Sequence, residues 1–224
     1  MNILALDTST DFCSAALWRD GQVIERGRSA GQSHSTLLLS MIDEVLAEAG
    51  VVLGALDGVA FGEGPGSFTG LRIACAVAQG LAFSSDLPVA GIGTLHAMAA
   101  ASAAPRVVCC LDARMQEVYH AAYCVDEGGL WHAVSAPRVC APLAIPEADG
   151  GGWTGCGSGF AVYGTALRER LGSSLSTVRL DIFPHARDIA ALAAPVFAEG
   201  RGLPAEQAAP IYIRDKVALK TAER

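Results

Sequence analysis

The sequence predicts an α/β protein of two similar lobes, each built around a mixed β-sheet. Short apolar strands alternate with apolar helices along the 224 residues, which is typical of α/β folds. The same order then begins again: an apolar strand ending in aspartate, a short polar turn and a second strand occur at Asp7 and at Asp112. This repetition indicates a duplicated core. We predict a first lobe at residues 1–105 and a second at 106–224, with the last segment packing back on the first lobe.

Composition restricts the kinds of function. The formal net charge is −7 and no run of lysine or arginine occurs, so the chain lacks the basic surface that grips nucleic acid. Only 17% of the residues are charged, against about 25% in an average soluble domain, which indicates apolar surface covered by a partner. The seven cysteines lack metal-type spacing and predict buried, reduced thiols. Without an export signal or an apolar run of about 18 residues, we expect a cytoplasmic protein that does not enter membranes.

The first lobe has clear apolar patterns. They predict strands at residues 3–6, 13–18, 23–29, 59–61 and 89–92, and helices at about 35–49, 71–83 and 94–104. Short turns join the first three strands, which predicts a meander. The helix at 71–83 has almost no polar side, and a helix that is apolar all round is buried on all sides. Beyond the sheet it needs either the second lobe or another chain as cover, and both alternatives stay open.

The second lobe is less regular. It predicts strands at 107–111 and 117–125, helices at about 160–171 and 184–200, and a strand-like segment at 210–214. Pro195 should kink or split the last helix. Residues 126–159 are rich in glycine and proline and offer only strand pieces near Trp131, Val139 and Trp153. Two lobes that each open with strand, aspartate and hairpin are typical of the actin-like fold of sugar kinases, in which the hairpins face each other across a nucleotide cleft.

Two glycine-rich loops are candidate binding elements. Residues 64–72 (GPGSFTGLR) join a strand to a helix, with glycines that allow close backbone approach and Ser67 or Thr69 as helix cap. The lysine of a P-loop is missing, because Leu71 follows Gly70. Three interpretations remain for this loop: an anion at the helix N-terminus, a protein surface, or a tight connection without a partner. Residues 155–159 (GCGSG) predict either a phosphate or adenosine loop or an ordinary turn from strand to helix.

Several stretches resemble one family nearly from end to end. Residues 3–9 (ILALDTS), the segment around His34, and residues 64–72, 112–119 (DARMQEVY) and 210–214 (PIYIR) resemble the bacterial TsaB (YeaZ) family. The 64–72 motif is shared in part with the paralogue TsaD, whereas 112–119 points to TsaB. The resemblance implies an actin-like (ASKHA) two-lobe fold and a part in forming N6-threonylcarbamoyladenosine (t6A) at position 37 of tRNAs that read codons beginning with A.

The resemblance also implies partners and a non-catalytic role. In that family TsaD transfers the threonylcarbamoyl group, TsaB forms a heterodimer with TsaD, and the pair engages the ATPase TsaE. TsaD-like chains carry a metal-binding His-x-x-x-His just after the strand corresponding to residues 89–92. Here Thr94 and Met98 occupy the two ligand positions, and His96 alone cannot form that site. We therefore expect no catalytic residue, metal or cofactor, a homodimer when TsaD is absent, and contact with tRNA only through the complex.

Two groups of residues are candidate sites. The candidate partner interface lies on two apolar helices: His34, Leu38, Ile42, Phe68, Arg72 and Ala74. The second group is a degenerate nucleotide site that lacks the expected glycine in its turns: Asp7, Thr8, Ser9, Asp112 and Arg114. Asp7 could hold a hydrated metal or bond the turn amides of Ser9 and Thr10. The alternative function is an autonomous ATP-dependent phosphotransferase or hydrolase, with Asp7 and Asp112 around Mg²⁺ and residues 155–159 on adenosine.

Overall fold

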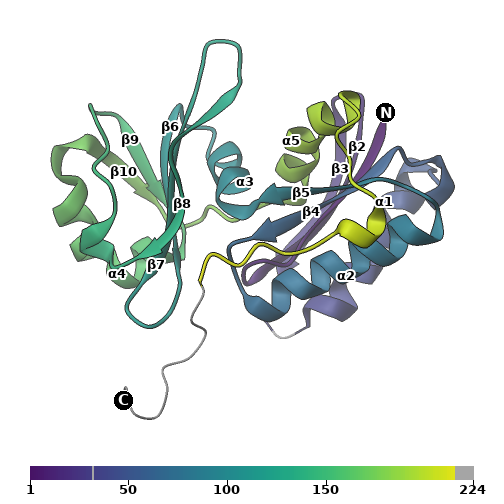
Figure 1. Cartoon of the computed structure of the whole chain (residues 1–224), viewed down its shortest axis with the longest axis horizontal. Helices are drawn as coiled ribbons and strands as arrows, with labels where there is room; N and C mark the ends of the chain where they lie inside the picture. Colours follow the sequence, from purple (N-terminus) through teal and green to yellow (C-terminus); the bar gives the residue numbers. More distant parts are fainter. Residues whose placement is uncertain (32, 215–224) are drawn as a thin grey trace.

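The computed structural model describes residues 1–31 and 33–214, which form two five-stranded sheets lying side by side (Figure 1). The strand order is β3-β2-β1-β4-β5 in the first sheet and β10-β9-β6-β7-β8 in the second. In each sheet the first three strands in sequence form an antiparallel meander, and two parallel strands extend the sheet on the other side. The predicted duplicated α/β fold is confirmed. We call the parts built on these sheets the first and second lobe.

The first lobe has helices on both faces of its sheet. Its strands are β1 (Asn2–Asp7), β2 (Phe12–Arg19), β3 (Gln22–Ser29), β4 (Gly58–Gly64) and β5 (Val89–Gly93). Leu4 and Leu6 of β1 pack under α1 (His34–Ala49) and α2 (Phe68–Ser84), while Ile3 and Ala5 face α5 (Ala186–Ala198). Alternate residues of a strand point to opposite faces, so β1 is apolar throughout because both faces are covered.

The second lobe repeats this plan with fewer helices. Its strands are β6 (Arg106–Asp112), β7 (Val118–Val125), β8 (Trp131–Cys140), β9 (Trp153–Cys156) and β10 (Leu175–Arg179). Helix α4 (Ser158–Leu171) covers one face with Phe160 and Leu167. Helix α3 (Thr94–Ala101) packs Leu95 and Met98 on the other face, so it lies between the two sheets (Figure 1). Short 3₁₀ helices occur at Leu53–Ala55, Pro142–Ala144, Gly172–Ser174 and Ala205–Gln207.

Residues from α5 to Ala205 return to the first lobe. Helix α5 contributes Ile189 and Ala193 to the core beneath the first sheet, and the Gln79 side chain of α2 donates a hydrogen bond to the Ala205 carbonyl at 3.1 Å. The domain boundary at residues 105 and 106 itself stays a prediction. Within the described ranges no helix is long and apolar enough to cross a membrane.

Two predicted features of this end are wrong. Pro195 does not split α5, because it lies in the last turn of the helix, where it removes at most one backbone hydrogen bond. Residues 210–214 form no strand. Only the Ile211 amide of this stretch bonds to a neighbouring strand, at the Glu63 carbonyl, and one bond does not make a ladder.

Candidate functional site

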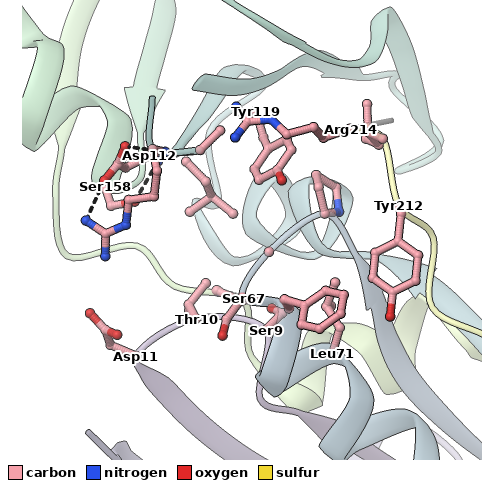
Figure 2. A pocket seen from close by; sticks show the side chains of 18 of the residues that line it. Ser9, Thr10, Asp11, Ser67, Leu71, Asp112, Tyr119, Ser158, Tyr212 and Arg214 are labelled. Atoms are coloured by element: carbon pink, nitrogen blue, oxygen red, sulfur yellow. Dashed lines mark hydrogen bonds and ion pairs between the residues drawn. The ribbon is translucent and has the colours of Figure 1, made fainter. Parts of the chain in front are cut away.

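A cleft of about 680 Å³ lies between the lobes, where the two hairpin turns face each other (Figure 2). The first lobe contributes Ser9, Thr10 and Asp11 from the turn after β1, and the second contributes residues 112–115. The predicted placement of the hairpins across a cleft is confirmed. The volume is within the roughly 300–1,000 Å³ of small-molecule sites, so the residues themselves must decide what the cleft can hold.

Asp7 lies beneath the cleft and does not line it. The side chain is completely buried, and its carboxylate accepts hydrogen bonds from the Ser9 amide and the Ser9 hydroxyl, all at 3.0 Å. Burial raises the pKa of Asp7 to about 7, although the bonds from Ser9 act in the opposite direction. Of the two roles predicted for Asp7, the structure supports the one that fastens the turn, through Ser9.

Thr8 is also buried, with its hydroxyl donating to the Gly70 carbonyl at 2.6 Å. Thr8 and Asp7, both assigned to the degenerate nucleotide site, therefore present no free polar group to the cleft. Buried polar groups need hydrogen-bond partners, and both side chains have theirs within the chain. Ser9 is the member of this turn that both lines the cleft and belongs to the predicted nucleotide site.

The second hairpin places bulky residues where a phosphate would need open backbone. Asp112 lines the cleft, but it accepts a hydrogen bond from the Arg114 amide at 2.9 Å and forms an ion pair with the Arg114 guanidinium at 3.0 Å. Arg114, Met115 and Gln116 have positive φ angles of 60°, 53° and 62°. Such angles are uncommon outside glycine, and three in a row make a strained turn. The residues present do not fit a metal-bound nucleoside triphosphate, which removes the support for the alternative phosphotransferase function.

The loop at residues 64–72 is shaped for contact with its own chain. A Cβ on Gly66 would lie 2.3 Å from the Ser9 carbonyl oxygen, and one on Gly70 would lie 1.9 Å from the Thr8 carbonyl oxygen. The Ser67 amide donates to the Ser9 carbonyl at 2.8 Å, and the Ser67 hydroxyl caps α2 by accepting from the Gly70 amide. Of the three interpretations, the tight connection within the chain is supported. The glycines are needed because two backbones touch.

The second glycine-rich loop is an ordinary turn from β9 into α4. A Cβ on Gly157 would lie 2.4 Å from the carbonyl oxygen of Cys110, and one on Gly155 would meet the Phe160 ring at 2.5 Å. These glycines let α4 pack closely on the second sheet. Ser158 alone of this loop lines the cleft, and its hydroxyl accepts a hydrogen bond from the Asp112 amide at 3.0 Å.

Three residues of the predicted partner interface lie in the core. Leu38, Ile42 and Ala74 are 0%, 3% and 0% exposed, because they point from α1 and α2 toward the first sheet. Their predicted contact with a partner is wrong. His34 is half-buried and donates its Nε2 proton to the Thr10 carbonyl at 2.8 Å, so it supports the turn after β1.

Phe68 and Arg72 do lie on the surface, at the N-terminal end of α2. Phe68 is 48% exposed, and the Arg72 guanidinium lies 3.8 Å above the centre of its ring. Arg72 also donates from Nε to the Tyr212 hydroxyl at 2.9 Å. This trio, which we call the aromatic cluster, combines the three side-chain types Phe, Arg and Tyr at the rim of the cleft.

The outward face of α2 is apolar and largely exposed in the described part of the chain. Ala76, Gly80 and Phe83 are exposed, and Ile73 and Val77 are half-buried beside them, packing partly against the core. Phe83 is 74% exposed, and Leu39 on neighbouring α1 is 52% exposed. Leu39 belongs to the other helix of the predicted apolar pair, and we call the five residues of α2 the outer face. Sequence reasoning missed them because a helix that is apolar all round shows no contrast between its faces.

A pair of leucine substitutions tests this assignment of faces. Leu38→Ala should destabilise the chain by about 3 kcal/mol, because it leaves a cavity in the core under α1. Leu39→Ala, one residue further, should change the free energy of unfolding by less than about 0.5 kcal/mol. Urea denaturation followed by circular dichroism measures both. Equal effects would mean that the faces of α1 are assigned wrongly.

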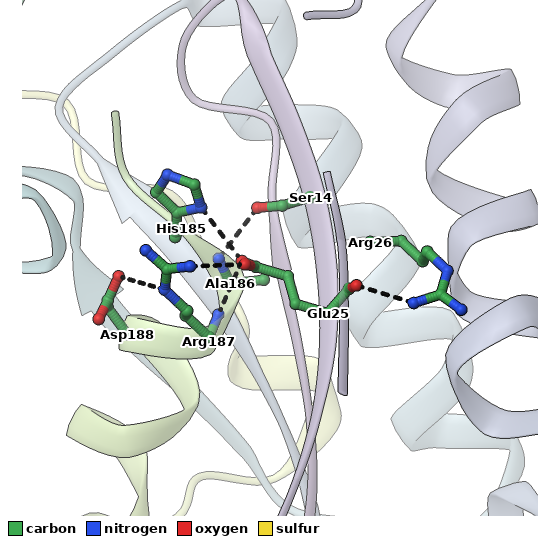
Figure 3. A network of polar contacts seen from close by, with 7 residues as sticks. All are labelled: Ser14, Glu25, Arg26, His185, Ala186, Arg187 and Asp188. Atoms are coloured by element: carbon green, nitrogen blue, oxygen red, sulfur yellow. Dashed lines mark hydrogen bonds and ion pairs between the residues drawn. The ribbon is translucent and has the colours of Figure 1, made fainter. Parts of the chain in front are cut away.

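A polar network fastens the start of α5 to the first sheet (Figure 3). The Glu25 carboxylate of β3 accepts hydrogen bonds at 3.3 Å from the Arg187 amide and guanidinium, and it lies 3.3 Å from His185 Nδ1. The Ser14 hydroxyl accepts from the Ala186 amide at 2.9 Å. No group of three or more His, Cys, Asp or Glu side chains suited to a metal occurs in residues 1–31 and 33–214. The contacts of Glu25 and Ser14 hold the start of α5 against β2 and β3.

The comparison with known proteins decides the family. The chain is 38% identical to the tRNA threonylcarbamoyladenosine biosynthesis protein TsaB of Escherichia coli (strain K12), over 98% of this chain and 97% of that protein. The chain belongs to the TsaB (YeaZ) family. The TsaB protein of Haemophilus influenzae is 37% identical over 98% of this chain and 96% of its own length.

Solved structures and a family model agree with this assignment. YeaZ from Pseudomonas aeruginosa superimposes with a TM-score of 0.84 at 37% identity, covering 94% of this chain and 99% of that chain. The family model described as TsaD, tRNA N6-adenosine threonylcarbamoyltransferase, matches residues 27–142. That range includes the 64–72 loop, the outer face of α2 and the strained hairpin. The part of this chain that matches the TsaD model thus holds most of the features described above.

Proposed function

We propose that this TsaB-family chain is a non-catalytic partner of a TsaD-family transferase in the formation of threonylcarbamoyladenosine in tRNA. The names of its full-length relatives support the pathway. The observation that carries the proposal is a contrast. Asp7, Thr8 and Asp112 of the predicted nucleotide site are bonded within the chain, whereas α2 exposes apolar residues on its outward side. Exposed apolar patches of this kind mark protein interfaces.

The positions of the TsaD metal ligands support a role without catalysis. Thr94 and Met98 stand there and are completely buried. His96 between them stacks on Tyr123 with ring centres 5.0 Å apart, and burial lowers the pKa of His96. A threonine hydroxyl, a thioether and one imidazole are a poor donor set for the divalent metals that two imidazoles bind.

The outer face suits a partner helix. Ala76 and Gly80 carry little or no side chain, so another helix can approach α2 closely, and Ile73, Val77 and Phe83 supply apolar area beside them. We propose a TsaD-family chain as the occupant, and a second copy of this chain when TsaD is absent. The net charge of −7 supports tRNA being held by the complex, and we extend the proposal to TsaE engaged by the pair.

The first test is size-exclusion chromatography with light scattering on this chain, alone and mixed with the TsaD of the same cell. A threonylcarbamoyl-transfer assay on tRNA with the mixture follows. We expect a heterodimer, and modification that needs both chains. Transfer by this chain alone, or failure to associate with TsaD under any nucleotide condition, would overturn the proposal.

A charge placed on the outer face should break the pair. Ala76→Arg is expected to weaken binding to TsaD by about 100-fold, because a guanidinium would be buried without a partner in the interface. Ala161→Arg, the same change at an exposed site of α4, is the matched control and should bind normally. Isothermal titration calorimetry measures both affinities, and thermal unfolding confirms that both variants fold. Equal affinities for the two variants would place the interface elsewhere.

A further inference from the structure

The segment at residues 210–214 runs from the first lobe to the second (Figure 1). On the first lobe the Ile211 amide donates to the Glu63 carbonyl at 2.7 Å, and the Ile211 carbonyl lies so close to Gly64 that a Cβ there would be 2.7 Å away. On the second lobe Arg214 forms an ion pair with Glu117 and lies 3.3 Å from the Met115 sulfur. Residues 211–214 therefore contact both lobes and span the cleft that they help to line.

The contact on the second lobe falls on the strained hairpin. Arg114, Met115 and Gln116 all have positive φ, and Glu117 follows them directly. The Arg214 side chain is only 14% exposed, so its ion pair is partly shielded from water and is worth more than a surface pair. Strain of this kind persists only where surrounding contacts fix it. Arg214 supplies one of the contacts that fix it, from the opposite lobe.

The contact on the first lobe falls on the aromatic cluster. Tyr212 is 46% exposed, packs on Phe68 with ring centres 5.5 Å apart, and accepts the hydrogen bond from Arg72. Arg72 is one helical turn from Ala76, so the cluster is continuous with the outer face. Tyrosine and arginine are the residue types that most often dominate binding energy at interfaces. A partner that covers the outer face of α2 therefore meets Tyr212 as well.

We propose that residues 210–214 are an interlobe strap that transmits partner binding on α2 to the strained hairpin of the second lobe. The identity of the partner as a TsaD-family chain rests on the proposed function. The partner orders Tyr212, the ordered strap holds Arg214 on Glu117, and the hairpin becomes fixed. This coupling is reciprocal. A strap that cannot reach the hairpin must therefore also lower the affinity for the partner, although Arg214 lies away from the outer face.

Hydrogen exchange measured by mass spectrometry on the full chain tests the strap. In the free chain, Arg214→Ala should speed exchange of the amides at 112–117 by about tenfold, and Glu117→Gln should act in the same direction. Arg201→Ala is the matched control, since Arg201 is exposed and, among the described residues, its side chain pairs with Glu199 two residues away. Added TsaD-family partner should slow exchange at 112–117 in the wild-type chain and not in Arg214→Ala. The affinity of Arg214→Ala for the partner should fall about tenfold.

Two results would overturn the strap. One is exchange at 112–117 in Arg214→Ala that equals the wild type. The other is a partner that slows exchange in α2 but leaves 112–117 unchanged. A wild-type chain that forms no complex at all would overturn the proposed function and the transmission together, whereas exchange in the free Arg214→Ala chain would still decide whether the strap holds the hairpin.

Discussion

Gly70→Ala is expected to prevent stable folding, at a cost of more than about 4 kcal/mol. The new Cβ would lie 1.9 Å from the Thr8 carbonyl oxygen, which is backbone and cannot turn aside as a side chain can. Gly70 is in the first turn of α2, and the Thr8 hydroxyl donates to the Gly70 carbonyl at 2.6 Å. Separating the two segments would break that bond and disturb Asp7, whose carboxylate is buried one residue away. The yield of soluble protein and urea denaturation measure the effect.

Gly80→Ala is the matched control on the same helix. Nothing lies within 4 Å of a Cβ at this position, and alanine is the better helix former, so this variant should gain about 0.5–1 kcal/mol. Gly70→Ala and Gly80→Ala therefore make the same chemical change with opposite expected signs. Similar stabilities for the two variants would mean that α2 does not press against the turn after β1.

Gly66 and Gly70 show what can be predicted from sequence and what cannot. The pattern of residues 64–72 predicted a close backbone approach and a serine cap on the helix, and both are present. The identity of the approaching backbone was open, because Thr8 and Ser9 are about sixty residues away and nothing in local composition encodes a non-local contact. A loop that touches its own chain and one that touches a ligand need the same glycines.

The faces of the helices and the edge of the second sheet were unpredictable for a related reason. Leu38 and Leu39 are adjacent and identical, and only the position of the sheet makes one buried and the other exposed. Strand β8 was visible only in pieces because it is an edge strand with most side chains exposed, so it lacks the alternation of apolar residues that marks a half-buried strand. The repeated strand, aspartate and hairpin, by contrast, indicated the duplicated fold that the structure has.

Asp7→Asn is expected to stabilise the chain at pH 8 and to have little effect at pH 4. Burial raises the pKa of Asp7 from 3.8 to about 7, so the folded state keeps the proton over a range in which the unfolded state releases it. Below about pH 4 both states are protonated and no penalty exists. As pH rises from about 4 to 7 the folded state loses stability relative to the unfolded state, and above about 7 the loss is complete. At about 1.4 kcal/mol per pKa unit, the full loss is about 4 kcal/mol.

The asparagine variant separates this charge from the hydrogen bonds of the turn. Its amide oxygen can accept from the Ser9 amide as the carboxylate does, and its amide nitrogen can donate to the Ser9 hydroxyl oxygen. Urea denaturation at intervals from pH 4 to pH 8 should show a difference between variant and wild type that grows with pH. Asp11→Asn makes the same substitution at an exposed carboxylate on the cleft wall and is the control.

The same variants bear on whether the cleft binds a nucleotide. A carboxyl group that is buried, bonded to Ser9 and only about half ionised at pH 7 is a poor ligand for Mg²⁺, which prefers ionised oxygens. ATP and Mg²⁺ should therefore leave the unfolding temperature of the wild type unchanged at pH 7, and Asp7→Asn should retain the transfer activity of the complex with TsaD. If Asp7→Asn instead raised the free energy of unfolding equally at every pH from 4 to 8, Asp7 would carry its charge in the folded state. A nucleotide-dependent rise in unfolding temperature that Asp7→Asn abolishes would favour the alternative, an autonomous phosphotransferase or hydrolase.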